Sequence, residues 1–218
     1  MTAQGMLVVT VTFVSFALLH SLTVSRFFKN YISGIIGETR MQAYYRLGFT
    51  LVAAIATVLA VYVIIIQPDT TLYRPPGYVV WPARFVQLAG IAIFILAQKP
   101  IKTGFFTGLQ QAKDYISTGK TGGDMEGIPE DALVTTGIYG LVRNPMYLAG
   151  ILIFMFEPVI TLNNLVLRFL ATAYFVWGAY IEERRFLADF GEAYIEYRRK
   201  VPRLNIIAGI YRKKHEVA

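Results

Sequence analysis

Long apolar runs recur along this chain and limit its fold more than any other feature. The clearest run covers residues 47–66 and contains no charged side chain, while the runs at 81–97, 147–161 and 164–181 contain one each. A helix needs about 20 apolar residues to cross the hydrocarbon layer of a bilayer, where unpaired backbone groups are costly. We therefore predict an all-α, polytopic integral membrane bundle of about five transmembrane helices. Residues 1–218 are expected to form a single domain.

The first apolar run, at residues 6–24, completes this set. It lacks the basic region and the small-residue cleavage site of a secretory signal, so we interpret it as a retained span. The composition agrees with membrane embedding, because 55% of the residues are hydrophobic and only 16% are charged. Soluble domains typically have about 25% charged residues.

The residue types exclude several kinds of site. Cysteine is absent and only two histidines occur, so the chain offers no thiol nucleophile, disulfide or thiolate ligand, and we predict no metal site. The net charge of +7 comes from basic residues that lie between or after the apolar runs. They form no continuous face for nucleic acid, so we expect membrane lipid as the partner, with Arg212, Lys213 and Lys214 anchoring the tail to anionic lipid.

The distribution of lysine and arginine predicts the orientation of the spans. Five of these residues lie at 98–147 and nine follow Tyr180, against two at 67–84. Because cytoplasmic segments carry the basic excess, five spans place the N-terminus outside and the C-terminus, the loop 98–146 and the tail 182–218 in the cytoplasm. The expected location is an inner or plasma membrane, with the active site at its cytoplasmic face. The long loop is either a functional lid or a mobile connector.

The stretch GIYGLVRNPMYLAG, at residues 137–150, joins this polar loop to an apolar run. The residue before a proline is pushed out of the helical region and proline suits a first helical turn, so Asn144-Pro145 predicts a helix start. The N–H groups and the positive dipole end at such a start favour anions. Arg143 adds a full charge, so we expect this boundary to hold an anionic group such as a carboxylate.

A second polar cluster, Glu182-Glu183-Arg184-Arg185, follows the last apolar run, and FGEAYIEYRRKVPR comes behind it at residues 190–203. Together with the stretch 137–150, these pieces resemble the C-terminal signature of the isoprenylcysteine carboxyl methyltransferase and phospholipid methyltransferase superfamily. That signature is approximately Gly-x-Tyr-x-x-x-Arg-His/Asn-Pro-x-Tyr, a hydrophobic hairpin, Glu-Glu, Phe-Gly-x-x-Tyr-x-x-Tyr and Val-Pro-Arg.

The resemblance implies methyl transfer from S-adenosylmethionine. The chemistry suits the residue types, because an activated methyl group needs mainly positioning, Arg143 suits the donor's carboxylate, and Glu182 or Glu183 suits its ammonium group or ribose hydroxyls. Nearer the acceptor, the resemblance nominates Arg185 as a catalytic residue and Tyr194, Arg198 and Arg203 as substrate-binding residues. The cofactor-binding residues that it nominates are Gly137, Tyr139, Arg143, Asn144, Pro145, Tyr147, Glu182 and Glu183.

A looser similarity extends towards the N-terminus. His20-Ser21, Tyr45-Arg46 and the segment 108–111, GLQQ, resemble the subgroup that contains methanethiol S-methyltransferase and the NnrU family. This favours a small or lipophilic acceptor, above all a thiol, and nominates His20 as the catalytic proton acceptor, since histidine titrates near neutral pH. Asn144 stands where prenylcysteine enzymes typically have histidine, which weakens the case for a prenylcysteine.

Other functions stay open at this point. Among methyltransferases, the alternative acceptors are a phospholipid amine and a prenylcysteine carboxylate. The NnrU similarity also allows a non-enzymatic membrane factor that supports a respiratory complex. A third class is a nicotinamide-dependent membrane reductase, because sterol reductases share a related C-terminal region.

Overall fold

The computed structural model describes residues 2–100, 103–120 and 133–216. The chain folds into two compact units, of which unit 1 takes residues 1–68 and 101–132 and unit 2 takes residues 69–100 and 133–218. The predicted loop 98–146 is divided between the units, and its segments 101–102 and 121–132 lie outside the described residues.

Within the described residues, four helices are long and apolar enough to cross a membrane. They confirm the predicted helical membrane bundle and are α1 (Thr2–Val24), α3 (Glu38–Ile65), α4 (Gly77–Gln98) and α8 (Leu162–Lys200). The run at 147–161 instead forms α7 (Pro145–Met155), an apolar helix of 11 residues. At 1.5 Å per residue α7 is about 16 Å long, which is roughly half the hydrocarbon layer. The orientation of the termini stays a prediction.

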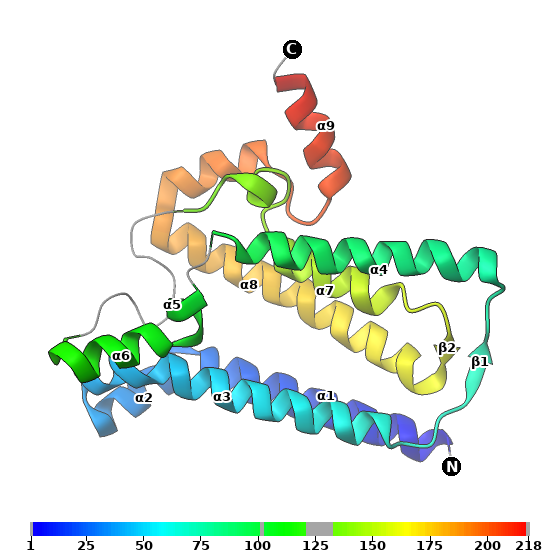
Figure 1. Ribbon diagram of the computed structural model, residues 1–218, viewed down its shortest axis with the longest axis horizontal. Coiled ribbons are helices and arrows are strands. Elements are labelled where there is room, and N and C mark those ends of the chain that lie inside the picture. Colours follow the sequence, from blue (N-terminus) through cyan, green and yellow to red (C-terminus); the bar gives the residue numbers. More distant parts are fainter. Residues whose placement is uncertain (1, 101–102, 121–132, 217–218) are drawn as a thin grey trace. The chain divides into compact units, whose positions relative to one another are not determined.

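In unit 1, α1 and α3 lie side by side (Figure 1). The short helices α2 (Arg26–Ile36), α5 (Thr103–Thr107) and α6 (Leu109–Thr118) pack against α3. The start of α2 is capped by Ser25, whose hydroxyl accepts a hydrogen bond from the Phe28 N–H at 3.2 Å. Gly37 then turns the chain into α3 with a φ of +85°, a conformation that glycine adopts without strain.

In unit 2, α7 packs against both α4 and α8 (Figure 1). Glycine permits the close approach, because a Cβ at Gly90 of α4 would lie 3.1 Å from the Ala149 carbonyl oxygen, and one at Gly150 would lie 2.7 Å from the Phe175 ring. Two short antiparallel strands pair with each other: β1 (Thr71–Tyr73) precedes α4, and β2 (Ile160–Thr161) lies between α7 and α8. The unit is completed by the 3-10 helix η1 (Gly137–Gly140) before α7 and by α9 (Ile206–Glu216) in the tail.

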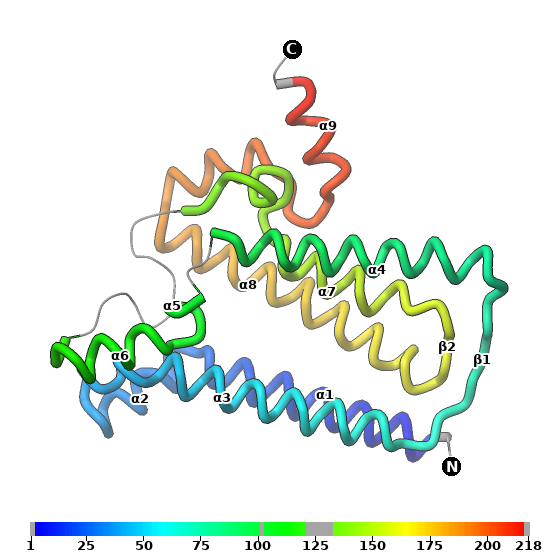
Figure 2. The backbone as a smooth tube through the Cα atoms, viewed as in Figure 1, coloured from blue at the N-terminus to red at the C-terminus, as the bar shows by residue number. Residues whose placement is uncertain are grey.

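Helix α8 begins sharply and breaks near its end. A capping box starts it: the Thr161 hydroxyl accepts from the Asn164 N–H, and the Asn164 side chain accepts from the Thr161 N–H. The turn before α8 therefore lies at 156–161. The predicted runs at 147–161 and 164–181 imply a later turn, after residue 161. Gly191 has a φ of +52° and a ψ of −124°, outside the helical region. The chain changes direction there, as the orange part of the tube in Figure 2 shows.

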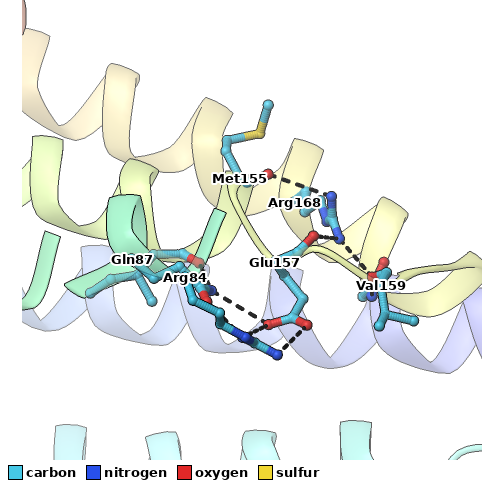
Figure 3. Close-up of polar contacts among 8 residues, drawn as sticks. Arg84, Gln87, Met155, Glu157, Val159 and Arg168 are labelled. Carbon is cyan, nitrogen blue, oxygen red and sulfur yellow. Dashed lines mark hydrogen bonds and ion pairs between the residues drawn. The ribbon is translucent and has the colours of Figure 1, made fainter. Parts of the chain in front are cut away.

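Arg168 of α8 binds the end of α7 and the turn that follows α7 (Figure 3). This residue is only 9% exposed, and its guanidinium donates hydrogen bonds to the carbonyls of Met155, Glu157 and Val159. The last carbonyls of a helix have no partner inside it, so these bonds replace the missing ones. Arg84 of α4 binds the Glu157 carboxylate at 2.7 Å, but the side chains of that pair are 45% and 32% exposed.

We expect Arg168→Met to lower the free energy of unfolding by about 1–3 kcal/mol, because it removes hydrogen bonds from a charged donor to three carbonyls. The matched variant Arg84→Met removes a partly exposed ion pair and is expected to cost at most about 1 kcal/mol. Unfolding of both variants in one detergent measures the difference. Equal losses would contradict the capping role of Arg168.

Candidate functional site

The polar centre of unit 2 is the carboxylate of Glu183 on α8, a residue that is 3% exposed. Its Oε1 accepts hydrogen bonds from Arg143 Nε at 3.0 Å and from Asn144 Nδ2 at 2.9 Å. Its Oε2 accepts one from Arg203 Nε at 2.9 Å, and Arg203 Nη2 lies 2.7 Å away. A buried carboxylate needs such partners to offset the loss of water. Glu183 therefore joins the segment before α7 to the segment after α8.

Arg143 uses its donors inside the protein. Its side chain is 8% exposed, and Nη2 lies 2.8 Å from Glu183 Oε1. Its Nη1 donates to the carbonyls of Arg198 at 2.8 Å and Val201 at 2.7 Å. Guanidinium carries five N–H donors in a rigid fork, which suits such multiple bonding. We call the set Arg143, Asn144, Glu183 and Arg203 the clamp.

The main chain at the start of α7 is also paired. As predicted, the helix begins at Pro145, with Asn144 as its N-cap. The N–H of Arg143 donates to the Pro202 carbonyl at 2.9 Å, and the N–H of Asn144 donates to the Arg203 carbonyl at 3.2 Å. These groups were expected to hold an anion, whereas in this structure they hold the segment 202–203. Cofactor binding by Arg143 and Asn144 stays a prediction, and their contacts give both a positioning role.

Three tyrosines surround the clamp. The Tyr197 hydroxyl donates to the Tyr139 carbonyl at 2.6 Å, and the Tyr139 hydroxyl donates to the Ala97 carbonyl at 3.3 Å. The Tyr194 ring is buried and lies edge-on to the Tyr197 ring, with centroids 5.9 Å apart. Burial, with a smaller contribution from the charge of Glu182, raises the pKa of Tyr139 to about 12. Its phenol therefore stays a neutral donor at physiological pH.

Glu182 meets different groups from its neighbour Glu183. It is half-buried, and it forms a side-chain hydrogen bond with Tyr147 of α7. The Tyr147 ring packs on Gly178, where an added Cβ would lie 2.7 Å from the ring. Gly178 therefore allows Tyr147 to approach α8 one turn before Glu182. Gly178 was not singled out from the sequence. The available signal was its position four residues before Glu182, which places it on the same side of a helix.

A cavity of about 400 Å³ lies beside the break in α8. It is lined by Leu187, which precedes Gly191, and by Ile195, Arg198 and Arg199, which follow it. Because the chain changes direction at Gly191, residues from before and after the break line the same cavity. Because Arg198 and Arg199 are exposed, the cavity is an open depression in the surface rather than an enclosed one. Apolar side chains and cations together suit a ligand that is partly apolar and partly anionic.

The other predicted residues of unit 2 occupy different places. Gly137 is exposed in η1 with a φ of +62°, which favours glycine. Arg185 Nε lies 3.9 Å from Asp189 Oδ2, one turn further along α8. Arg198 lines the cavity, whereas Arg203 belongs to the clamp. The hydrogen bond to Glu183 raises the pKa of Arg203, so this residue stays cationic.

His20 lies in α1 of unit 1. Its ring packs against the rings of Phe16 and Phe49, with centroids 5.9 and 5.4 Å away. Arg46 lies over the same Phe49 ring. Gly108 lies against the main chain beside Arg46, because a Cβ added at Gly108 would be 2.2 Å from the nitrogen of Leu47. The motifs at 20–21, 45–46 and 108–111 therefore gather within unit 1. The catalytic role of His20 stays a prediction.

Known proteins similar to this chain are methyltransferases. The family model described as phospholipid methyltransferase matches residues 90–193. A methanethiol S-methyltransferase of Pseudomonas sp. (strain GM41(2012)) is 30% identical over 187 residues, which cover 85% of this chain and 67% of the relative. Methanethiol S-methyltransferase 1 of Bradyrhizobium diazoefficiens is 24% identical over 212 residues, with coverage of 93% and 67%. A methanethiol S-methyltransferase of Crocosphaera subtropica is 37% identical over 70 residues, with coverage of 32% and 28%.

The matched region contains α7 and most of α8, and so includes Arg143, Asn144 and Glu183 of the clamp. The chain spans between about a quarter and two thirds of the length of the curated relatives it matches. No solved structure matches the chain.

Proposed function

Because the chain belongs to the isoprenylcysteine carboxyl methyltransferase and phospholipid methyltransferase superfamily, we propose that it transfers a methyl group from S-adenosylmethionine to a small thiol. One observation carries the proposal. The two halves of the signature meet in the clamp, where Arg143 and Glu183 bind each other at 2.8 and 3.0 Å across 40 positions of sequence. The names of the relatives favour a thiol over a phospholipid amine or a prenylcysteine.

The residues of unit 2 fit S-adenosylmethionine in their chemistry. When bound, this molecule supplies a methyl group activated on a sulfonium, and it carries a carboxylate, an ammonium group, ribose hydroxyls and an adenine. The cavity beside Gly191 offers the apolar Leu187 and Ile195 and the cations Arg198 and Arg199. We assign the carboxylate to Arg199, because the donors of Arg143 already bind Glu183 and the carbonyls of Arg198 and Val201. Glu182 suits the ammonium group or the ribose hydroxyls.

The clamp acts by positioning. Its bonds fix the segment 137–145 against the end of α8, and so hold Tyr139 and Tyr147 in place. Methyl transfer gains mainly from such fixed geometry, because the reacting atoms must be aligned and shielded from water. The tyrosine rings also suit contact with a sulfonium cation or an adenine face.

The thiol must lose a proton to become a strong nucleophile. We propose that a ring nitrogen of His20 accepts that proton. Arg185 stays a proposed catalytic residue of unit 2. Tyr194 is buried and Arg203 is clamped, so we assign substrate contact to Arg198 first among the three nominated residues. The chain is an integral membrane protein with membrane lipid around it, and we propose that its active site faces the cytoplasm.

We expect Glu182→Gln to weaken S-adenosylmethionine binding about tenfold, because a hydrogen bond to a charged group is worth about 1.5–3 kcal/mol. The matched variant is Glu196→Gln, since Glu196 is exposed and pairs only with Lys200 among the described residues. Its affinity is expected to stay at the wild-type value. Isothermal titration of both variants measures the difference, and unchanged binding by Glu182→Gln would remove Glu182 from the cofactor site.

The acceptor is tested with methyl-labelled S-adenosylmethionine and protein reconstituted in nanodiscs. Methanethiol, phosphatidylethanolamine and a prenylcysteine are offered in separate reactions. The proposal predicts label in dimethyl sulfide. Label in the lipid or the prenylcysteine ester would overturn the thiol while keeping methyl transfer. No labelled product with any acceptor, together with turnover of a nicotinamide cofactor, would favour the reductase, and no turnover at all would favour a respiratory support factor.

A further inference from the structure

Helix α9 is docked to unit 2 by one of its faces. Gly209 is buried against the loop before α7, where an added Cβ would lie 1.7 Å from the Leu141 carbonyl oxygen. Ile206 packs against a core cluster that includes Val142 and Leu148. The start of the helix is set by Asn205, whose Oδ1 accepts from the Ala208 N–H at 3.0 Å. This side of α9 is therefore fixed two residues from Arg143.

A second face of α9, beside the docked one, is apolar and exposed. Ile207, Ile210 and Tyr211 are 77%, 52% and 65% exposed. Their spacing of three and four residues places them on one side of the helix. The helix projects away from α4, α7 and α8 (Figure 1), and these helices leave its outward face uncovered. Clustered apolar side chains of this kind mark a surface that contacts a partner or a membrane.

Three cations follow this apolar face in the sequence, and they identify its partner. Arg212, Lys213 and Lys214 follow it directly, and all three are exposed. Lys214, three residues after Tyr211 and four after Ile210, lies on the same side of the helix. They belong to the nine lysines and arginines that follow Tyr180, which exceed the six acidic residues of the same segment. A short helix that combines exposed apolar side chains with lysine and arginine suits the interface of a bilayer with anionic headgroups. Unit 2 also contains α4 and α8, which are long and apolar enough to cross a bilayer, so α9 belongs to the same unit as two candidate membrane spans.

We propose that α9 docks on the anionic surface of the membrane, with Ile207, Ile210 and Tyr211 in the headgroup layer and the three cations on lipid phosphates. This surface contact is separate from the spanning helices and does not rest on the proposed methyltransferase activity. Because Gly209 holds α9 against Leu141, the docked helix also braces the loop that carries Arg143.

The absence of native cysteine makes the test direct, because one introduced cysteine carries the only label. Tyr211→Cys and the matched variant Lys213→Cys are spin-labelled and placed in nanodiscs with or without anionic phosphatidylglycerol. Accessibility is measured to oxygen, which enters lipid, and to a water-soluble nickel chelate. We expect the oxygen-to-nickel ratio at position 211 to exceed that at position 213 several-fold in anionic nanodiscs.

Changing Arg212, Lys213 and Lys214 to glutamine in the Tyr211→Cys protein tests the charge. Each lost cation is expected to lower the partitioning of α9 onto the anionic surface about fivefold. The oxygen-to-nickel ratio at position 211 should therefore fall towards its value in neutral nanodiscs. Equal nickel access at positions 211 and 213 would overturn the proposal by placing α9 in water. A label at 211 that neither reagent reaches would also overturn it, because protein, such as a second copy of the chain, would then cover this face.

Discussion

Replacing Glu183 with alanine is expected to destabilise unit 2 by about 3–5 kcal/mol, the usual effect of breaking a buried ion pair. Arg143 would be left at 8% exposure without its carboxylate, and Asn144 and Arg203 would lose the same acceptor. Denaturant or thermal unfolding in detergent measures the loss. Glu183→Gln keeps one oxygen acceptor, so a smaller loss is expected.

The matched control is Glu196→Ala, which removes an exposed pair with Lys200 and is expected to leave the stability close to the wild-type value. If Glu183→Ala proved too unstable to purify, the ranking of Glu183→Gln below Glu196→Gln would still test the clamp. Equal stability of these two variants would contradict a structural role for Glu183.

The second large effect is expected from His20→Gln, which should lower kcat for a thiol about 100-fold or more at neutral pH. Glutamine keeps polarity and similar size but has no basic nitrogen to take the thiol proton. The loss is expected to shrink as pH rises, since the thiol then ionises without help. The matched control is His215→Gln, because His215 is the other histidine of the chain and lies exposed on α9.

The pH profile separates this role from a structural one. A packing defect at His20, whose ring contacts Phe16 and Phe49, would lower kcat equally at every pH. An unchanged kcat in His20→Gln would assign the proton to another group and leave the methyltransferase proposal standing.

The sequence was most informative where one local rule decides the outcome. Long apolar runs with at most one charged residue predicted most of α1, α3 and α4 and much of α8, because hydrocarbon imposes length and composition on a span. Asn144-Pro145 predicted the start of α7, because proline restricts the residue before it. The family signature also selected Arg143 and Glu183, which contact each other.

The sequence was least informative where distant segments satisfy one another. The donors of Arg143 looked available for a cofactor, but Arg198 and Val201 accept from them through main-chain oxygens, which no residue type reveals. The break at Gly191 depends on a single backbone conformation. Glu157-Pro158, inside the apolar run at 147–161, left open whether the helix bends or ends there, and the helix ends at Met155. Gly178 and Gly209 matter through the space that they leave, which becomes visible only when the partner segment is placed.

The most direct test of the central claim is calorimetric titration of S-adenosylmethionine and S-adenosylhomocysteine into the detergent-purified protein. We expect both to bind, in the micromolar to millimolar range common for enzyme substrates, and we expect Glu182→Gln to weaken both while Glu196→Gln does not. Absence of binding to protein that is shown to be folded would contradict methyl transfer from S-adenosylmethionine, most decisively if the same sample bound a nicotinamide cofactor.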